Sequence, residues 1–244
     1  MHRCYLPQAD WSAGTLLVEG EEAHHALRVM RLRPGNVCEV FDGCGQAARA
    51  SVLSGQGSSL SLKVEEMLPP MPAVAGVTLA LAIPKGANMD LIVQKAVEMG
   101  VSRIIPLVTE RTIVRLQGKE AAAKAAKWRR TALEACKQCG VNTLPQVEEP
   151  QAFSAFLQRA DLPGLRVACA IVPHARPLRA VFEEARAAGH RDVVLLIGPE
   201  GDFSPAEYAA AEAAGFLSAS LGPIILRVET AVFMAAAAAR YALD

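Results

Sequence analysis

The stretch from residue 193 to residue 239 constrains the fold of this chain more than any other. It opens with five apolar residues, VVLLI at 193–197, which are typical of a strand buried on both faces of a sheet. The next residues, GPEG at 198–201, must turn, because glycine and proline interrupt a strand. A second short strand is expected at 216–221, and Gly222-Pro223 forms a second turn directly after it.

A helix is predicted between these two strands. Ser204 fits its N-cap, Pro205 its first helical position and Glu207 the closing position of a capping box. Gly215 is expected to end this helix, and an alanine-rich helix closes the chain. Ligands of open α/β sheets bind outside the carboxyl ends of the strands, so the two glycine turns can line one crevice. A purely structural role for both turns stays open, because the dinucleotide and P-loop fingerprints are absent.

Composition supports a folded chain with a sizeable core. The 244 residues are 52% hydrophobic and 20% charged, which suits one large or two small domains. No apolar segment of signal-peptide type follows Met1, and the longest apolar run, at 231–239, is too short to cross a bilayer. Six cysteines in a chain of this length indicate reduced thiols rather than a disulfide framework. We therefore expect a cytoplasmic protein without membrane contact.

Charge is unevenly distributed along a chain whose net charge is zero. Residues 73–142 hold 11 Lys and Arg against 5 Asp and Glu, a net charge of +6. A local basic surface of this kind is typical of phosphate contacts. The simpler interpretation, a solvated lysine-rich helix face, stays open.

The first part of the chain reads differently from the rest. Short strand-like segments separated by turn-forming residues predict a small β-barrel or sandwich; they lie at 16–18, 37–41, 48–53 and 60–64. A short helix is expected at 21–31. Its adjacent His24 and His25 face different sides of the helix, which argues against a metal pair. A basic helical edge that contacts phosphate is the better interpretation.

Three prolines between residues 69 and 72 mark the best domain boundary, which divides the chain into residues 1–70 and 73–244. Beyond it, a strand at 77–83 and a helix at 89–99 capped by Asn88 begin an α/β domain. Further elements are expected as strands at 104–108 and 166–172 and helices at 119–139, 153–159 and 177–189.

The helix at 119–139 carries Lys124, Lys127 and Arg130 on one face. Cys136 and Cys139 have a zinc-like spacing, but no second pair completes four ligands, so they are interpreted as small packing residues. We therefore expect no metal.

Several motifs together resemble a known family. IGPEG at 197–201 and LGPIILRVETA at 221–231 are similar to segments of the SPOUT-superfamily 16S rRNA uracil-N3 methyltransferases, the RsmE family, which modify U1498. Matching segments upstream, in the same order, are HALRVMR at 25–31, PKG at 84–86, QKAVEMG at 94–100, TERT at 109–112 and EACKQ at 134–138.

The resemblance implies a PUA-like, RNA-binding β-barrel over residues 1–70 and a SPOUT methyltransferase domain over residues 73–244. The second domain would be α/β, with a parallel sheet and a deep trefoil knot. The resemblance also implies S-adenosylmethionine as methyl donor, 16S rRNA in the small ribosomal subunit as substrate, and a homodimer.

Site residues follow from the same resemblance. The expected cofactor wall comprises Ile197, Gly198, Glu200, Gly201, Leu221, Gly222, Ile225 and Leu226. For Glu200 the alternative is a carboxylate that binds backbone amides at the turn. Arg227 is expected to steady the oxyanion of uracil and Glu229 to orient or accept its N3 proton; an ion pair that braces the cofactor loop is the alternative for both. Because the target base must leave its stack, cations should grip the flanking phosphates. The candidates for that grip are Arg28, Arg31, Lys85, Arg111 and Arg129.

Three positions depart from the family pattern. Asp202 stands where a second glycine is usual, Val228 where threonine is common, and Val141 where an arginine is common. The departures at Asp202 and Val141 keep open a non-catalytic RNA-binding or ribosome-assembly protein with the same fold. A nucleotide-dependent oxidoreductase or kinase is disfavoured, because both glycine fingerprints are missing.

Overall fold

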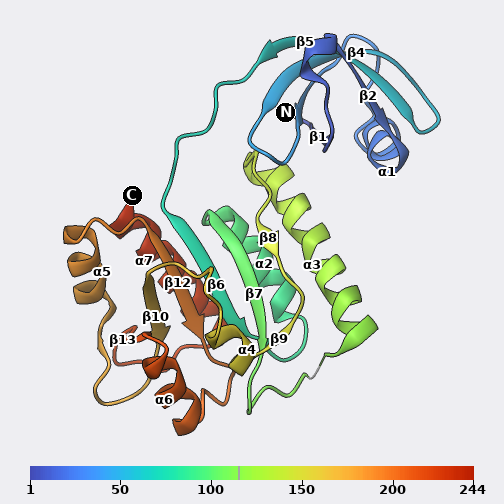
Figure 1. Cartoon of the computed structure of the whole chain (residues 1–244). Helices are drawn as coiled ribbons and strands as arrows, with labels where there is room; N and C mark the ends of the chain where they lie inside the picture. Colours follow the sequence, from blue (N-terminus) through green and yellow to red (C-terminus); the bar gives the residue numbers. More distant parts are fainter. Residues whose placement is uncertain (115) are drawn as a thin grey trace. The chain divides into compact units, whose positions relative to one another are not determined.

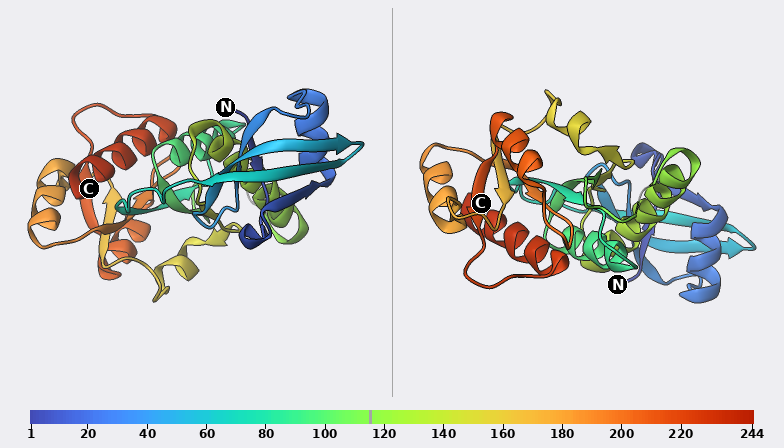
Figure 2. Two further views of the ribbon diagram at one scale, coloured as in Figure 1. Left: turned by 90° about the horizontal axis from the view of Figure 1, so that it is seen from above. Right: turned by 90° about the horizontal axis from the view of Figure 1, so that it is seen from below.

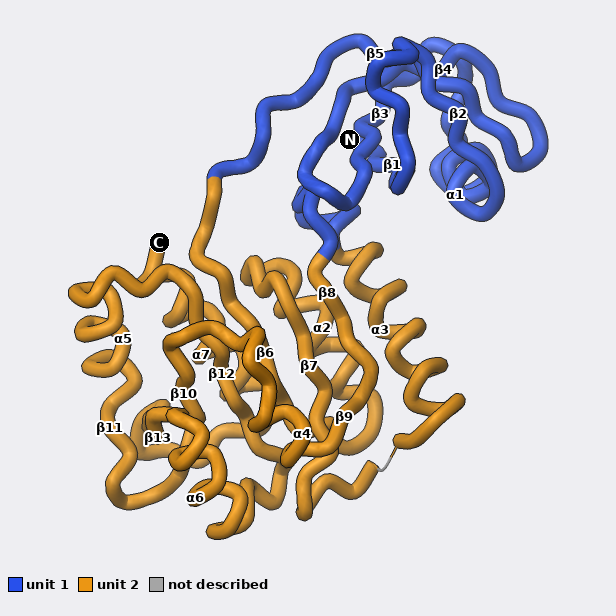
Figure 3. The backbone as a smooth tube through the Cα atoms, in the orientation of Figure 1, with its two compact units in different colours: residues 1–72, 136–144 blue, residues 73–135, 145–244 orange. Residues whose placement is uncertain are grey.

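A computed structural model of the chain describes residues 1–114 and 116–244. These residues form two compact units (Figures 1 and 3). The first comprises residues 1–72 and 136–144, and the second comprises residues 73–135 and 145–244.

The first unit is a curled five-stranded sheet that forms a half-barrel. Its strands are Arg3–Tyr5 (β1), Thr15–Glu19 (β2), Val37–Phe41 (β3), Ala47–Gln56 (β4) and Ser59–Met67 (β5), in the spatial order β1-β3-β4-β5-β2. Neighbouring strands pair antiparallel, except β1 and β3, which are parallel. Alternate residues such as Leu16, Val18, Val40 and Leu62 enter one apolar core, as the two-residue period of a strand requires.

Three strands of this unit, β2, β4 and β5, are longer than the sequence predicts. The expected turn at 54–59 shrinks to a tight hairpin in which Gly57 has a φ of 63°. Gly55 stays within β4, where an added Cβ would clash with Cδ2 of Leu27. Glycine is therefore present at this position because the strand and the neighbouring helical segment approach closely, rather than because the chain turns there.

The helical segment of the first unit begins as α1 (Gly20–His24) and continues as a π-helical turn, η2 (His25–Val29); a short 3-10 turn, η1, covers Trp11–Ala13. The sequence predicts one helix over 21–31. The observed helix ends earlier, because Arg31 has a φ of 57°, a left-handed conformation that a right-handed helix cannot contain.

Arg3 joins the segment 136–144 to the sheet of the first unit. Its guanidinium donates to the carbonyl oxygens of Cys136 at 2.7 Å and Val141 at 3.2 Å, and to the side chain of Asn142. It also pairs with Glu39 at 3.0 Å and lies 4.4 Å from the ring centroid of Phe41. β1, which holds Arg3, was not predicted from the sequence.

The second unit contains a parallel sheet in the order β11-β13-β10-β12-β6-β7-β8, with β9 paired to β7. The strands are Gly76–Ala82 (β6), Val101–Val108 (β7), Gln146–Val147 (β8), Gln151–Ala152 (β9), Leu165–Cys169 (β10), Arg176–Pro177 (β11), Asp192–Ile197 (β12) and Leu217–Ser220 (β13). The predicted α/β class and parallel sheet are confirmed.

Helices cover both faces of this sheet (Figures 1 and 2). They are Asn88–Glu98 (α2), Gly118–Cys139 (α3), Phe153–Leu157 (α4), Leu178–Ala187 (α5), Pro205–Ala213 (α6) and Val228–Leu243 (α7). On one face α7 packs against α2, α5, β12 and β6. On the other, Val194 and Leu196 of β12 join an apolar cluster with Phe156 of α4 and Tyr208 of α6. β12 is thus buried on both faces, as its apolar run predicts.

The start of α6 confirms the predicted capping box. The backbone amide of Ser204 donates to Oε2 of Glu207 at 2.9 Å, and the amide of Glu207 donates to the Ser204 hydroxyl at 3.3 Å. Pro205 follows the cap as the first helical residue. The other oxygen of Glu207 accepts from the amide of Glu110 at 2.8 Å, so the cap also ties the loop after β7 to α6.

Within residues 1–114 and 116–244, no helix combines the length and the apolar character needed to cross a bilayer. In the same part of the chain, no cluster of three or more His, Cys, Asp or Glu side chains could hold a metal ion.

Candidate active site

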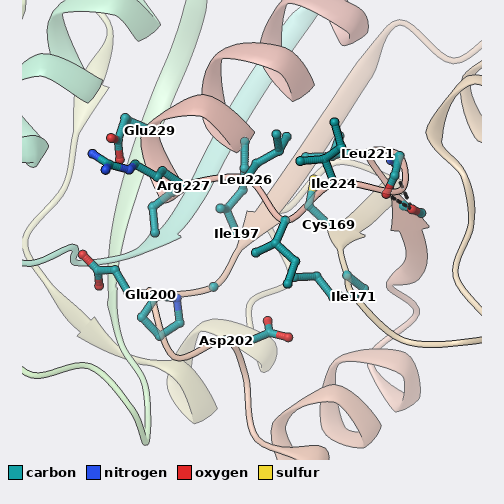
Figure 4. A pocket seen from close by; sticks show the side chains of 18 of the residues that line it. Cys169, Ile171, Ile197, Glu200, Asp202, Leu221, Ile224, Leu226, Arg227 and Glu229 are labelled. Atoms are coloured by element: carbon teal, nitrogen blue, oxygen red, sulfur yellow. Dashed lines mark hydrogen bonds between the residues drawn. The ribbon is translucent and has the colours of Figure 1, made fainter.

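A cavity of about 490 Å³ opens in the second unit at the carboxyl ends of β10 and β12 and beside the loop at 221–227 (Figure 4). Ile197 and Gly198 supply one part of its wall, and residues 220–229 supply another. The two glycine-containing turns predicted from the sequence therefore meet at one crevice. This position follows from the parallel order of the strands, whose carboxyl ends share one edge of the sheet.

The expected cofactor wall largely coincides with the observed lining. Ile197, Gly198, Glu200, Leu221, Gly222, Ile225 and Leu226 all line the cavity. Much of this wall is backbone, and Gly222 has a φ of 121°, which favours glycine. Exposed Ile224 and Ile225 add apolar surface at the mouth, where their exposed fractions are 74% and 78%.

Gly201 is the expected cofactor residue that does not line the cavity. Its carbonyl oxygen instead accepts a hydrogen bond from Nη1 of Arg111 at 2.7 Å. The carbonyl oxygen of Phe203 lies 3.5 Å from the same nitrogen. Gly201 and Arg111 thus form a contact between the turn after β12 and the loop after β7.

Asp202 lines the cavity in a left-handed backbone conformation, with a φ of 60°. Its Oδ1 accepts from the hydroxyl of Tyr208 at 2.6 Å and from the amide of Phe203 at 2.8 Å. Burial, together with the hydrogen bond to Asp202, raises the pKa of Tyr208, so its phenol stays protonated and donates to Asp202.

The proposed catalytic pair lies at the start of α7. Arg227 is the N-cap residue of this helix and Glu229 lies in its first turn. Both line the cavity, on the side where Glu200 also lies (Figure 4). Among the described residues, neither side chain has an ion-pair partner within 4.0 Å, so they do not form the bracing ion pair that the sequence left open. The cavity-lining Val228 between them is itself 5% exposed.

Part of the cavity wall was not identified from the sequence. The wall also includes Cys169, the last residue of β10, and the two residues that follow it, Ala170 and Ile171. The strand predicted at 166–172 could have identified these residues, because the carboxyl ends of parallel strands lie at the same edge of a sheet. Burial raises the pKa of the Cys169 thiol to about 12, which makes it a packing residue rather than a nucleophile. Asn88 also lines the cavity; the N-cap of α2 is Ala87, so the predicted capping role of Asn88 is wrong.

The predicted RNA-contacting residues fall into two groups. Arg28 and Arg31 line a cavity of about 370 Å³ in the first unit, together with Arg33 and the hairpin tip at 55–57. In the second unit the Lys85 side chain is exposed, whereas Arg129 donates from Nε to the carbonyl of Val147 at 2.8 Å.

Fold and site together define a class, the RNA-modifying enzymes that join a PUA domain to an α/β methyltransferase domain. A family described as "RNA methyltransferase domain" matches residues 71–240, and a second, "RNA methyltransferase PUA domain", matches residues 18–65.

Individual relatives narrow this class. Ribosomal RNA small subunit methyltransferase E of Synechocystis is 33% identical, over 91% of this chain and 72% of the relative. The Bacillus subtilis protein of that name is 31% identical, over 94% of this chain and 91% of the relative. A crystal structure of the Neisseria gonorrhoeae protein of that name, bound to S-adenosylmethionine, superposes with a TM-score of 0.87 at 32% identity, covering 98% of this chain and 96% of that one. The chain belongs to the ribosomal RNA small subunit methyltransferase E family.

Proposed function

We propose that this chain transfers a methyl group from S-adenosylmethionine to N3 of a uridine in 16S rRNA of the small ribosomal subunit, at the position equivalent to U1498. One observation carries the proposal: a backbone-lined cavity at the carboxyl ends of parallel strands, in a member of a small-subunit rRNA methyltransferase family. The neighbour from Neisseria gonorrhoeae, with its bound S-adenosylmethionine, supports the choice of methyl donor.

The cavity residues fit this donor. A volume of about 490 Å³ suits a nucleoside with an amino-acid side chain. Apolar groups from Ile197, Leu221 and Ile225 suit an adenine ring, and backbone amides of the turns suit its ring nitrogens. When bound, S-adenosylmethionine supplies an electrophilic methyl group on a positively charged sulfur.

The chain's own contribution to the reaction is positioning and charge. N3 of uracil carries a proton that must leave for the nitrogen to form its bond to carbon, and the negative charge is then shared between N3 and the two carbonyl oxygens beside it. Arg227 lines the cavity, has no ion-pair partner among the described residues, and is proposed to stabilise this oxyanion. Glu229 is proposed to orient the base or to accept the N3 proton. Methyl transfer forms the N3–carbon bond as the carbon–sulfur bond breaks, so alignment of the reactants supplies much of the rate.

The RNA is proposed to be held by arginines and lysine on both units. Arg28 and Arg31 in the first unit are the strongest candidates, because none of the described carboxylates forms an ion pair with them. Lys85 is proposed to contact RNA from the turn after β6. Arg111 and Arg129 are proposed to use those guanidinium nitrogens that are not occupied by backbone carbonyls.

A homodimer and a cytoplasmic location are proposed as well. A groove of about 630 Å³ runs between α5 and α7, and its lining includes Tyr241 and Met234, which are 92% and 47% exposed. Apolar surface of this extent on two helices suits a second copy of the chain. In such a dimer one subunit's PUA domain could reach RNA bound at the other's cavity. The deep trefoil knot of the family is also proposed for the second unit.

Two experiments test the function. Calorimetry with S-adenosylmethionine first asks whether the donor binds; absence of binding would leave only a non-catalytic RNA-binding or ribosome-assembly role. Methyl transfer is then measured on small subunits from cells that lack the endogenous enzyme, followed by nucleoside analysis. We expect 3-methyluridine. Another labelled base or a labelled ribose would refute the substrate while leaving the methyltransferase activity standing.

A further inference from the structure

Asp202 occupies a backbone position that suits glycine. Its φ of 60° lies in the left-handed region, which disfavours most side chains but is tolerated by Asp and Asn. Residues held in this region cluster at ligand sites, where surrounding contacts stabilise them. Here those contacts are the hydrogen bonds from Tyr208 and from the amide of Phe203, both to Oδ1.

The two carboxylate oxygens of Asp202 have different surroundings. Oδ1 is fixed by its two donors and packs over Gly198, where an added Cβ would lie 3.1 Å from it. Oδ2 has no hydrogen-bond partner among the described residues, and the side chain lines the cavity on the side of Ile171 (Figure 4). A rigid acceptor with one occupied and one open oxygen is thus presented to the ligand.

The charged side chains that line the cavity indicate which ligand Oδ2 of Asp202 would favour. The described lining contains the carboxylates of Glu200, Asp202 and Glu229, against one guanidinium, that of Arg227. S-adenosylmethionine carries one positive charge more than S-adenosylhomocysteine, the product left after methyl transfer. A cavity with an excess of carboxylates therefore favours the donor over the product through Coulomb attraction.

We propose that Asp202 is a specificity-determining residue, whose carboxylate favours the cationic methyl donor over its uncharged-sulfur product. This inference rests on the proposed function and deepens it.

The test compares two dissociation constants, those of S-adenosylmethionine and S-adenosylhomocysteine, measured by calorimetry on the full chain. Asp202→Asn removes the charge, keeps an acceptor and tolerates the left-handed backbone. We expect it to weaken donor binding about tenfold and product binding less than about twofold, because only the donor has the extra charge. Asp202→Gly, which also suits the backbone, should lower the preference equally.

Two control variants separate charge from structure. Tyr208→Phe removes a donor to Oδ1 but keeps the carboxylate, so the donor-to-product preference should stay within about twofold of the parent value. Glu120→Gln removes a carboxylate from exposed α3, outside the cavity lining, and should change neither constant.

The outcomes distinguish the proposed role of Asp202 from the proposed methyltransferase function. Equal losses of donor and product binding in Asp202→Asn, or no loss of either, would overturn the role of Asp202 while leaving the methyltransferase proposal intact. Failure of the parent chain to bind the donor at all would instead refute the proposed function.

Discussion

The carboxylate of Glu200 accepts a hydrogen bond from the backbone amide of Lys85, with 2.9 Å between Oε1 and the nitrogen. β6 and β12 are neighbouring parallel strands, so this bond joins the turns that leave them at the carboxyl edge of the sheet. Glu200 also lines the cavity. Glu200, which the resemblance assigns to the cofactor wall, therefore holds together two turns at the edge of this cavity.

Replacement of Glu200 tests this link. Glu200→Ala should lower the free energy of unfolding by about 1 kcal/mol, the usual net value of one hydrogen bond. It should also weaken S-adenosylmethionine binding about fivefold, since the turn is no longer held. Glu200→Gln retains an acceptor oxygen and should lose less of both. Denaturant unfolding measures the loss of stability, and calorimetry measures the loss of S-adenosylmethionine binding. If the alanine variant matches the parent in both, the hydrogen bond stabilises neither the fold nor the cavity.

Arg227 offers a test of chemistry separated from binding. Its side chain is exposed and has no ion-pair partner among the described residues, so Arg227→Ala should alter stability by no more than about 0.5 kcal/mol. Loss of one oxyanion-stabilising donor lowers turnover by about 100-fold in comparable sites. We expect that drop in kcat on small subunits, with the donor dissociation constant changed less than about twofold. The reverse pattern would make Arg227 a cofactor-loop residue.

Arg3 should contribute strongly to the stability of the first unit. Its side chain is 5% exposed and its ion-pair partner Glu39 is 22% exposed. Arg3→Ala removes the donor of that carboxylate, of the Val141 carbonyl oxygen and of the Asn142 side-chain oxygen, which should cost about 3 kcal/mol. The thermal midpoint should therefore fall by roughly 6 to 12 °C. Arg49→Ala is the matched control: its pair with Glu66 is 44% and 60% exposed and should contribute less than about 1 kcal/mol.

Local signals account for what the sequence predicted well. The capping box from Ser204 to Glu207 depends on residues within one helical turn, and it formed as expected. The apolar run of β12 predicted a strand buried on both faces, and its position fixed the cavity at the strand ends. In each case the residues that decide the structure are neighbours in sequence.

Contacts between distant segments account for what the sequence missed. β1 is three residues long, and it is held by pairing with β3 and by the reach of Arg3 to the segment 136–144. No periodicity signals such a strand. The orientation of Gly201 toward Arg111, rather than toward the cavity, depends likewise on a partner 90 positions away. From its neighbours in sequence Asn88 is predicted to cap a helix. It lines the cavity instead, because the turn after β6 places it there.

The ionisation of Asp161 should make the stability of the fold depend on pH. Hydrogen bonds from Arg159, and then from Arg103, hold the pKa of this carboxyl well below its usual value of 3.8. The unfolded chain therefore binds the proton first, and the stabilisation is complete above about pH 4 and is lost as the pH falls below that value. Asp161→Asn should flatten the acid limb of a stability profile below pH 4 and leave its slope above pH 5 unchanged. An unaltered acid limb would show that the bonds from Arg159 and Arg103 to Asp161 do not contribute to stability. Because the side chain of Asp161 is 54% exposed, the expected effect is modest.

Arg31 allows a test of RNA contact that does not disturb the fold. Its φ of 57° suits glycine, so Arg31→Gly removes the guanidinium while keeping the backbone conformation. If Arg31 contacts one phosphate, the variant should bind a 16S rRNA fragment more weakly, and the slope of log affinity against log salt should fall by about one unit. Arg28→Ala should behave alike, whereas Arg49→Ala, on β4 and already paired with Glu66, should leave the slope unchanged. Donor binding in the second unit should not change in any of the three, because the donor cavity contains none of these residues. A salt slope equal to that of the parent in both Arg31→Gly and Arg28→Ala would remove the basic cavity of the first unit from the RNA-binding surface.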